Sequence, residues 1–282
     1  MVEVSARPSW PYRLPAGRGA DGVSRTRDGV WERLLVVEGN HVLVRAWMQP
    51  DGSASIAAMG VPDRWLHRTE ARLPASPSEL ERAVELARHA LALDDDLSAF
   101  YARFKRDPLL GGAIRRRPWL RIGRCPDPWE AFAWAVTEQL IEASEAARIQ
   151  QRMIERWGEA IEVPGERRPL RTVPAAATIA ELSPAEITAC GLAPKRSLAL
   201  IGAAREIAAG RCDPSDPADD RRLLAISEIG PWTVQVLGVR GRGDHDALPS
   251  GDLAYVKLVG HLAGLGRRST VDEVESYFAP YA

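Results

Sequence analysis

Apolar and polar residues alternate in three runs between Val30 and Gly60. The runs WERLLVVEG, HVLVRAWM and SASIAAMG are separated by the dipeptides Gly39-Asn40 and Asp51-Gly52. Dipeptides of this kind favour the tight turns that join antiparallel strands. The first part of the chain is therefore predicted to contain an antiparallel β-sheet.

The pattern takes on a helical period after Ser76. The sequence Ser76-Pro77-Ser78-Glu79 has the form of a capping box with proline at the first helical position. Apolar residues then keep helical spacing at Leu80, Ala83, Val84, Ala87 and Leu91. A helix beginning here is expected to pack on the sheet.

From Asp127 onward, strand patterns nearly vanish and helix patterns recur. Residues Asp127–Glu130 are expected to cap a long helix with one apolar stripe, made of Phe132, Ala133, Val136 and Leu140. Further helices are predicted over Ala147–Trp157, after Ser183 and ahead of Gly210, and Glu162–Thr178 is interpreted as a linker. The predicted fold class is α+β, with a mixed sheet and helix domain over residues 1–111 and an all-α domain over residues 112–282.

The length and composition fit a globular chain of two domains, with 282 residues of which 45% are hydrophobic. No apolar run approaches the roughly 18 residues that cross a bilayer, and the N-terminus MVEVSARPSWPYRLP lacks a secretory pattern. We therefore expect a cytoplasmic protein without membrane contact. Cys125, Cys190 and Cys212 are far apart and form no CxxC or Cys/His cluster, so neither a disulfide framework, zinc nor an iron–sulfur cluster is expected.

The formal net charge of -1 does not by itself indicate a nucleic-acid partner. Charge is concentrated locally in Ile114–Arg124, IRRRPWLRIGR, which either contacts phosphates or forms a solvated loop. The run Asp94-Asp95-Asp96 is expected to cap a helix through Asp96 rather than to bind a metal, because consecutive acids point in different directions.

Residues 223–237 have the pattern of two short helices joined by a tight turn. Leu223–Ile226 ends the first helix, Ser227–Gly230 forms the turn, and Pro231 begins the second helix, which ends near Gly238. Such a helix-hairpin-helix presents backbone amides and a helix N-terminus to a DNA phosphate, without needing a basic protein. A loop then returns the chain to a third helix that begins at Asp252.

The motifs around this hairpin carry a family resemblance. The hairpin is followed by Leu248-Pro249-Ser250-Gly251-Asp252-Leu253, and it ends in Gly230-Pro231-Trp232-Thr233. The segments Asp107–Gly112, Asp127–Glu130 and Leu192–Arg196 extend the match to most of the chain. The sequence thus resembles the helix-hairpin-helix DNA glycosylase superfamily, and within it 3-methyladenine DNA glycosylase II.

The resemblance implies a monomeric, monofunctional enzyme that hydrolyses the N-glycosidic bond of alkylated purines in double-stranded DNA with damaged bases, in base-excision repair. It implies that Asp252 is the catalytic carboxylate, and that Trp232 and Leu253 bind the extruded base. No lysine stands in the second hairpin helix to form a Schiff base. From the residues alone, a helix cap is the favoured interpretation of Asp252, and a core residue that of Trp232.

The resemblance also implies a set of DNA contacts: Gln139, Leu140, Ser227, Glu228, Ile229, Gly230 and Thr233. Leu140 is the expected wedge in the DNA gap, with core packing as the alternative. Backbone carbonyls of Leu224, Ile226 and Ile229 are expected to hold a monovalent cation, sodium or potassium, and no other cofactor is expected.

Acidic residues depart from the family pattern at three positions. Glu228 replaces the first glycine of the hairpin, where its charge repels phosphate and a positive φ angle would strain it. Glu138 and Glu142 replace small or hydroxyl residues beside Gln139. These changes favour a second hypothesis, a catalytically weak or inactive DNA-binding protein that senses damage.

Overall fold

The computed structural model describes residues 1–66, 74–164, 166 and 168–282. These residues form two compact units. The first comprises Met1–Pro126 and Gln151–Pro174, and the second comprises Asp127–Gln150 and Ala175–Ala282. The domain boundary expected between residues 111 and 112 stays a prediction.

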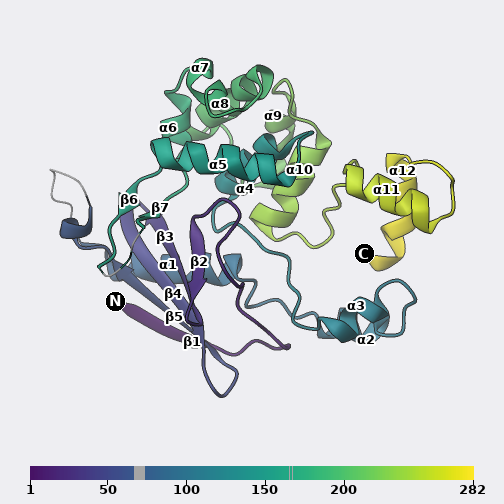
Figure 1. Ribbon diagram of the computed structural model, residues 1–282, viewed down its shortest axis with the longest axis horizontal. Helices are drawn as coiled ribbons and strands as arrows, with labels where there is room; N and C mark the ends of the chain where they lie inside the picture. Colours follow the sequence, from purple (N-terminus) through teal and green to yellow (C-terminus); the bar gives the residue numbers. More distant parts are fainter. Residues whose placement is uncertain (67–73, 165, 167) are drawn as a thin grey trace. The chain divides into compact units, whose positions relative to one another are not determined.

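A five-stranded antiparallel sheet forms the centre of the first unit (Figure 1). Its order is β1-β5-β4-β3-β2. The strands are β1 (Val2–Ala6), β2 (Ser24–Arg27), β3 (Val30–Val37), β4 (Asn40–Met48) and β5 (Ala54–Gly60). The predicted sheet and the α+β class are confirmed, while β1 and β2 lie outside the three runs from which the sheet was predicted.

The tight turn between β3 and β4 lies one residue earlier than the sequence predicts. Val37 pairs with Asn40, so the turn residues are Glu38 and Gly39, both with positive φ angles of 49° and 87°. This is the backbone of a type I′ turn, which matches the twist of the two strands. At the second predicted turn, Gly52 has the expected positive φ angle of 83°.

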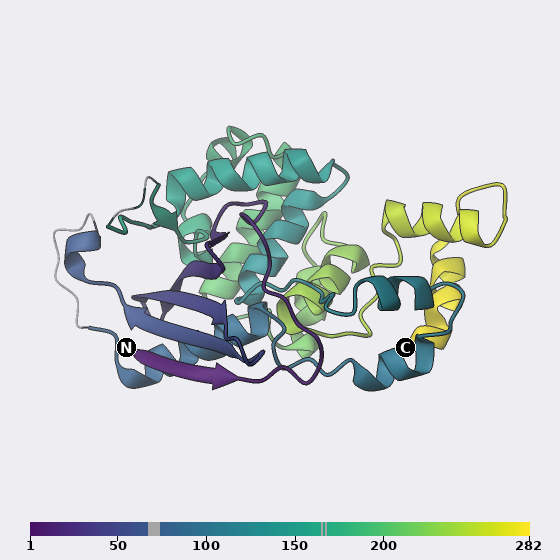
Figure 2. The same cartoon turned by 60° about the horizontal axis from the view of Figure 1, so that its bottom comes forward.

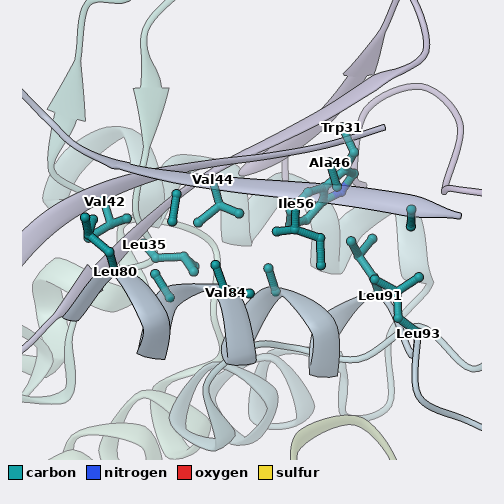
Figure 3. Close-up of a cluster of buried hydrophobic side chains, with 14 of the residues drawn as sticks. Trp31, Leu35, Val42, Val44, Ala46, Ile56, Leu80, Val84, Leu91 and Leu93 are labelled. Carbon is teal, nitrogen blue, oxygen red and sulfur yellow. The ribbon is translucent and has the colours of Figure 1, made fainter. Parts of the chain in front are cut away.

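Helix α1 (Pro77–Ala90) covers one face of the sheet, as predicted. Its capping box is present, with the Glu79 amide donating to the Ser76 hydroxyl and the Ser76 amide donating to the Glu79 carboxylate. Figure 3 shows Leu80 and Val84 of the helix facing Val42, Val44 and Ile56 of the strands. Residues on the other face of the same strands, such as Leu34 and Leu43, pack on the small sheet of β6 (Ala160–Ile161) and β7 (Leu170–Arg171).

The remainder of the first unit is short helices and loops. They are η1 (Asp63–Trp65), α2 (Ser98–Phe104) and α3 (Gly111–Arg116). Ahead of α2, Asp96 accepts the Ser98 amide at 2.9 Å, while Asp94 pairs with Arg88 and Asp95 with Arg124. Each acid of this run therefore has its own partner. The stretch interpreted as a linker, Glu162–Thr178, contains β7, and its residues 165 and 167 lie outside the described residues.

Helices make up the second unit (Figures 1 and 2). The elements are α4 (Pro128–Glu138), α5 (Ala143–Trp157), α6 (Ala176–Ala180), α7 (Pro184–Thr188), α8 (Pro194–Ala208), η2 (Pro217–Asp219), α9 (Asp220–Leu224), α10 (Pro231–Leu237), η3 (Gly238–Arg242), α11 (Leu253–Leu262), α12 (Val271–Phe278) and η4 (Ala279–Tyr281). One of the points at which the chain passes from one unit to the other falls within α5. Asp127 and Ser183 cap α4 and α7 as predicted. No described helix is long and apolar enough to span a membrane.

Candidate DNA-binding and catalytic site

A helix-hairpin-helix lies in the second unit at the predicted residues. Helix α9 ends at Leu224, the turn follows, and α10 begins at Pro231, whose missing amide costs nothing at the first helical position. Ile229 of the turn and Val234 of α10 are buried, which fixes the turn on the helices behind it. Helix α10 continues directly into a π-helical turn, η3.

Glu228 stands in the left-handed region of the backbone, with a φ angle of 71°. The sequence predicted this strain from the replacement of a glycine, and the structure confirms it. A non-glycine residue in this region costs about 1 kcal/mol or more and persists only where its surroundings hold it. The Glu228 carbonyl accepts a hydrogen bond from Nε2 of Gln139 at 3.0 Å, and its carboxylate lies 3.8 Å from Nζ of Lys195.

Asp252 occupies the N-cap of α11, and its two carboxylate oxygens have different partners. Oδ1 accepts the Ala254 amide at 2.7 Å, which is the capping bond. Oδ2 accepts Nε1–H of Trp232 at 3.1 Å. The half-buried carboxylate is thus held by two donors, and an ionised carboxylate still has lone pairs for a third. Leu253, the first residue of α11, is half exposed beside it.

The loop before Asp252 is anchored by α12. The buried Ser250 donates its hydroxyl to the Glu275 carboxylate at 2.8 Å. Ser269, ahead of α12, bonds through its amide and hydroxyl to the Val256 carbonyl of α11. Because α11 and α12 also pack on each other, α12 supports the helix that presents Asp252 (Figure 1).

Gln139 and Leu140 lie in the turn after α4, not within the long helix as the sequence predicted. Gln139 is the C-cap of α4, and Leu140 has a positive φ angle of 54°. The exposed fraction of Leu140 is 102%, so the alternative of core packing is wrong. Nε2 of Gln139 donates to the Thr233 hydroxyl at 2.9 Å as well as to Glu228, which joins this turn to the hairpin. Thr233 itself is buried.

The acidic residues beside Gln139 differ in their surroundings. Glu138 accepts two hydrogen bonds from Nη1 of Arg240, at 2.9 and 2.7 Å, so its charge is compensated. Glu142 is exposed between α4 and α5. The partner of Glu138 is 102 residues away in the sequence, and no local spacing indicates it.

The hairpin carbonyls expected to hold a cation are chemically suited to one. Ile226 accepts the Ile229 amide at 3.1 Å, and a carbonyl oxygen has a second lone pair for a ligand. Uncharged oxygen ligands suit hard cations. With Leu224 at the end of α9, the three carbonyls belong to one short turn, and the cation stays a prediction. Among the described residues, no cluster of His, Cys, Asp and Glu could hold a metal ion.

Several arginines of Ile114–Arg124 have structural partners within the first unit. Arg115 donates to the Lys105 carbonyl, Arg121 to Pro118 and Leu120, and Arg124 pairs with Asp95. Arg116 and Arg117 are exposed. Contact with phosphates, one of the two interpretations of this stretch, therefore rests mainly on these two side chains.

The five-stranded sheet and the helical unit with its hairpin match the fold of solved DNA glycosylases. A solved structure with this fold, the 3-methyladenine DNA glycosylase from Archaeoglobus fulgidus, matches with a TM-score of 0.72. The match covers 99% of this chain and 92% of that one at 17% identity, which shows the fold alone. The resemblance stated from the sequence is confirmed at this level.

Curated relatives extend the likeness to sequence. The chain is 28% identical over 214 residues to the DNA-3-methyladenine glycosylase of Bacillus subtilis (strain 168), covering 74% of this chain and 70% of the relative. It is 25% identical over 241 residues to DNA-3-methyladenine glycosylase 2 of Escherichia coli (strain K12), covering 83% and 76%. No family model matches the chain.

Proposed function

We propose that this protein is a monofunctional DNA glycosylase that hydrolyses the N-glycosidic bond of alkylated purines, of the 3-methyladenine type, in double-stranded DNA. The observation that carries this proposal is the carboxylate of Asp252, held by Trp232 and by the first turn of α11. The names of the relatives from Bacillus subtilis and Escherichia coli support the same activity.

The chemistry needs one fixed negative charge. As the bond between the sugar and the base breaks, its electron pair leaves with the base and positive charge develops on the sugar. An ionised Asp252 stabilises that charge without reorganising, because both of its oxygens are already held by donors. Water then adds to the sugar carbon, and the carboxylate orients this water and takes up its proton.

Trp232 contributes to the proposed site in two ways. Its Nε1–H orients Asp252, and the faces of its ring are free of that bond, so they are suited to stack on an electron-poor alkylated base. Leu253 lies next to the carboxylate and supplies apolar surface for the same base. Selectivity for positively charged bases follows from this pair of an aromatic ring and a carboxylate.

A hydrolytic rather than a lyase mechanism follows from the residues of α10. The helix reads PWTVQVL and contains no lysine that could attack the sugar. The next lysine in the chain is Lys257, an exposed residue of α11 five positions after Asp252. Asp252 therefore activates water in the proposed reaction.

The hairpin is the proposed anchor on DNA. Its turn, Ser227–Gly230, offers amides to a phosphate, and Gln139 and Leu140 approach the gap left by the extruded nucleotide. A monomeric enzyme of this kind acts on chromosomal DNA, so we place it in the cytoplasm in association with the nucleoid.

Glu228 favours a second candidate function, a damage-sensing protein with little or no catalysis. Its carboxylate lies in the turn that approaches phosphate and weakens binding by repulsion. A pure binding protein has no use, however, for a carboxylate beside DNA at the position of Asp252. The catalytic proposal is therefore preferred.

Base release from a methylated DNA duplex tests the proposal directly. We expect the protein to release methylated purines and to leave unbroken strands with abasic sites, since α10 carries no lysine. The control is Asp252→Asn, which removes the charge. Binding to the methylated duplex without release would contradict the proposal and support the damage sensor.

A further inference from the structure

The turn between α4 and α5 holds a fully exposed leucine in an unfavourable backbone conformation. Leu140 combines an exposed fraction of 102% with a φ angle of 54°. Neither property stabilises the folded protein, since the side chain buries nothing and the left-handed region disfavours residues with a Cβ. Such a conformation persists only where neighbouring contacts impose it.

Two side chains ahead of Leu140 provide these contacts. Gln139 reaches the Thr233 hydroxyl and the Glu228 carbonyl through Nε2, at 2.9 and 3.0 Å. Its own carbonyl accepts a hydrogen bond from Nη1 of Arg196 in α8. The Glu138 carboxylate accepts a hydrogen bond from Nη1 of Arg240 at 2.7 Å and a longer one from Nε2 of Gln150 at 3.3 Å.

The two side chains that contact Gln139 and Glu138 from the hairpin, Thr233 and Arg240, belong to one continuous helical segment. Thr233 lies in the first turn of α10, and Arg240 lies in the π-helical turn η3 that extends α10. Gly241 permits this arrangement, because a Cβ there would meet Ala131 of α4 at 3.0 Å and Pro128 at 3.1 Å. The helical segment that begins at the DNA-anchoring turn therefore contacts the Leu140 turn through residues near both ends of the segment.

We infer that Arg240, through Glu138, is a positioning residue that holds Leu140 in place as a preformed wedge for the DNA gap. The inference rests on the proposed function, because it assigns Leu140 a task in extruding a base. When the hairpin docks on a phosphate, the position of Leu140 is then set as well. The turn that carries Leu140 does not have to become ordered on the DNA.

The geometry argues against a purely stabilising role for this ion pair. The side chains of Arg240 and Glu138 are 32% and 26% exposed, and water screens a pair at such a site. What distinguishes this pair is its position next to the turn that carries Leu140.

The test compares two DNA substrates that differ only in the free energy needed to extrude the damaged base. One duplex has an alkylated purine opposite thymine, and the other has the same lesion opposite an abasic analogue, where unpairing is already complete. Arg240→Gln is expected to lower single-turnover base release about tenfold on the paired lesion and less than about threefold on the unpaired one, because a wedge acts on base extrusion, which costs less where the base has no pairing partner.

Matched variants separate positioning from general damage. Leu140→Ala should show the same preference for the unpaired lesion, and adding Arg240→Gln to it should have little further effect, because both changes remove one function. The exchange Glu138→Arg with Arg240→Glu restores the pair and should recover the rate. Arg211→Gln breaks the ion pair with Glu206 in the same unit, and it should change the rate of base release from neither substrate.

Equal losses on the two substrates, or additive losses with Leu140→Ala, would overturn the inference. Fluorescence provides a readout that does not depend on catalysis. A duplex with 2-aminopurine paired with thymine should brighten when the parent protein unstacks the base, and less so with Arg240→Gln. If the parent releases no base, the proposed function fails, while equal brightening by parent and variant would refute the positioning role by itself.

Discussion

Nε1 of Trp232 donates a hydrogen bond to Oδ2 of Asp252 at 3.1 Å, while the other oxygen of the same carboxylate caps α11. Capping and catalysis are usually weighed as alternative explanations for an aspartate at the start of a helix. Here the cap uses one oxygen only. The capping bond and the indole bond fix the orientation of the carboxylate, so capping and the proposed catalytic role support each other.

Asp252→Asn is expected to abolish base release while leaving the fold intact. Asparagine caps helices about as well as aspartate, but with its oxygen bound to the Ala254 amide its NH₂ group takes the place of Oδ2, and a donor there cannot accept the N–H of Trp232. We therefore expect a stability loss of about 1 kcal/mol. The rate of base release should fall by about 10²–10³-fold because the charge is lost. It should fall further because the side chain no longer activates the attacking water.

Thermal unfolding, single-turnover kinetics and DNA affinity check this variant together. Affinity should survive or improve, because a negative charge is removed from a surface that approaches phosphates. Release of methylated purines at the parental rate would refute the catalytic role. A variant that mainly unfolds would assign Asp252 to capping alone.

Trp232→Phe separates the hydrogen bond of Trp232 from its ring. Phenylalanine keeps an aromatic face for the base but has no N–H for Asp252. A hydrogen bond to a charged group contributes about 1.5–3 kcal/mol, so kcat should fall by about 10–100-fold with a smaller change in KM. Trp232→Leu should raise KM as well. If the Phe variant changed KM alone, the indole bond would have no part in catalysis.

Glu228→Gly and Glu228→Ala distinguish charge from backbone strain. Both remove the carboxylate and release Lys195, so both should tighten binding to duplex DNA, by a few-fold for about 1 kcal/mol of repulsion. Only glycine accepts a φ angle of 71° without strain, so only Glu228→Gly should also gain about 1 kcal/mol of stability. Affinity at fixed salt and denaturant unfolding measure the two effects. Weaker binding by both variants would show that the carboxylate does not face phosphate.

The stability of α12 is expected to depend on acid pH through Glu273. The Arg267 guanidinium and then the Thr270 amide, both bonded to this carboxylate, lower the pKa of Glu273 from 4.5 to about 2. A lowered pKa in the folded state means that the carboxylate stabilises the fold fully above about pH 4.5 and less as the pH falls towards 2.

Glu273→Gln removes that contribution at every pH. The difference in Tm between parent and variant should therefore be largest above about pH 4.5 and shrink as the pH falls towards 2. Thermal unfolding across this range, monitored by circular dichroism, provides the measurement. A difference that stays constant down to pH 3 would show that the Arg267 pair does not stabilise the folded state.

Local chemistry explains which parts of the fold were predictable. The caps at Ser76, Asp127 and Ser183 depend on residues within one turn, so the sequence reveals them directly. Strand β1 was missed, since its five residues are stabilised by pairing with β5, about fifty positions away. The β3–β4 turn was misplaced by one residue, because glutamate at a positive φ angle is unusual.

The candidate site divides in the same way. The hairpin and Asp252 follow a contiguous motif and were found from it, although their roles stay predictions. Leu140 continues the apolar spacing of α4, and nothing local indicates that the helix ends two residues before it. The bonds from Arg240 to Glu138 and from Trp232 to Asp252 join positions 102 and 20 residues apart, which only tertiary structure brings together.

The conformation of Leu140 separates folding from function at a single position. Glycine would accept its φ angle without strain and would expose no apolar surface, so Leu140→Gly should make the protein more stable. Selection for thermostability alone would therefore favour glycine here. A library varied at this codon and sorted first for heat resistance, then for repair, should enrich different residues in the two sorts.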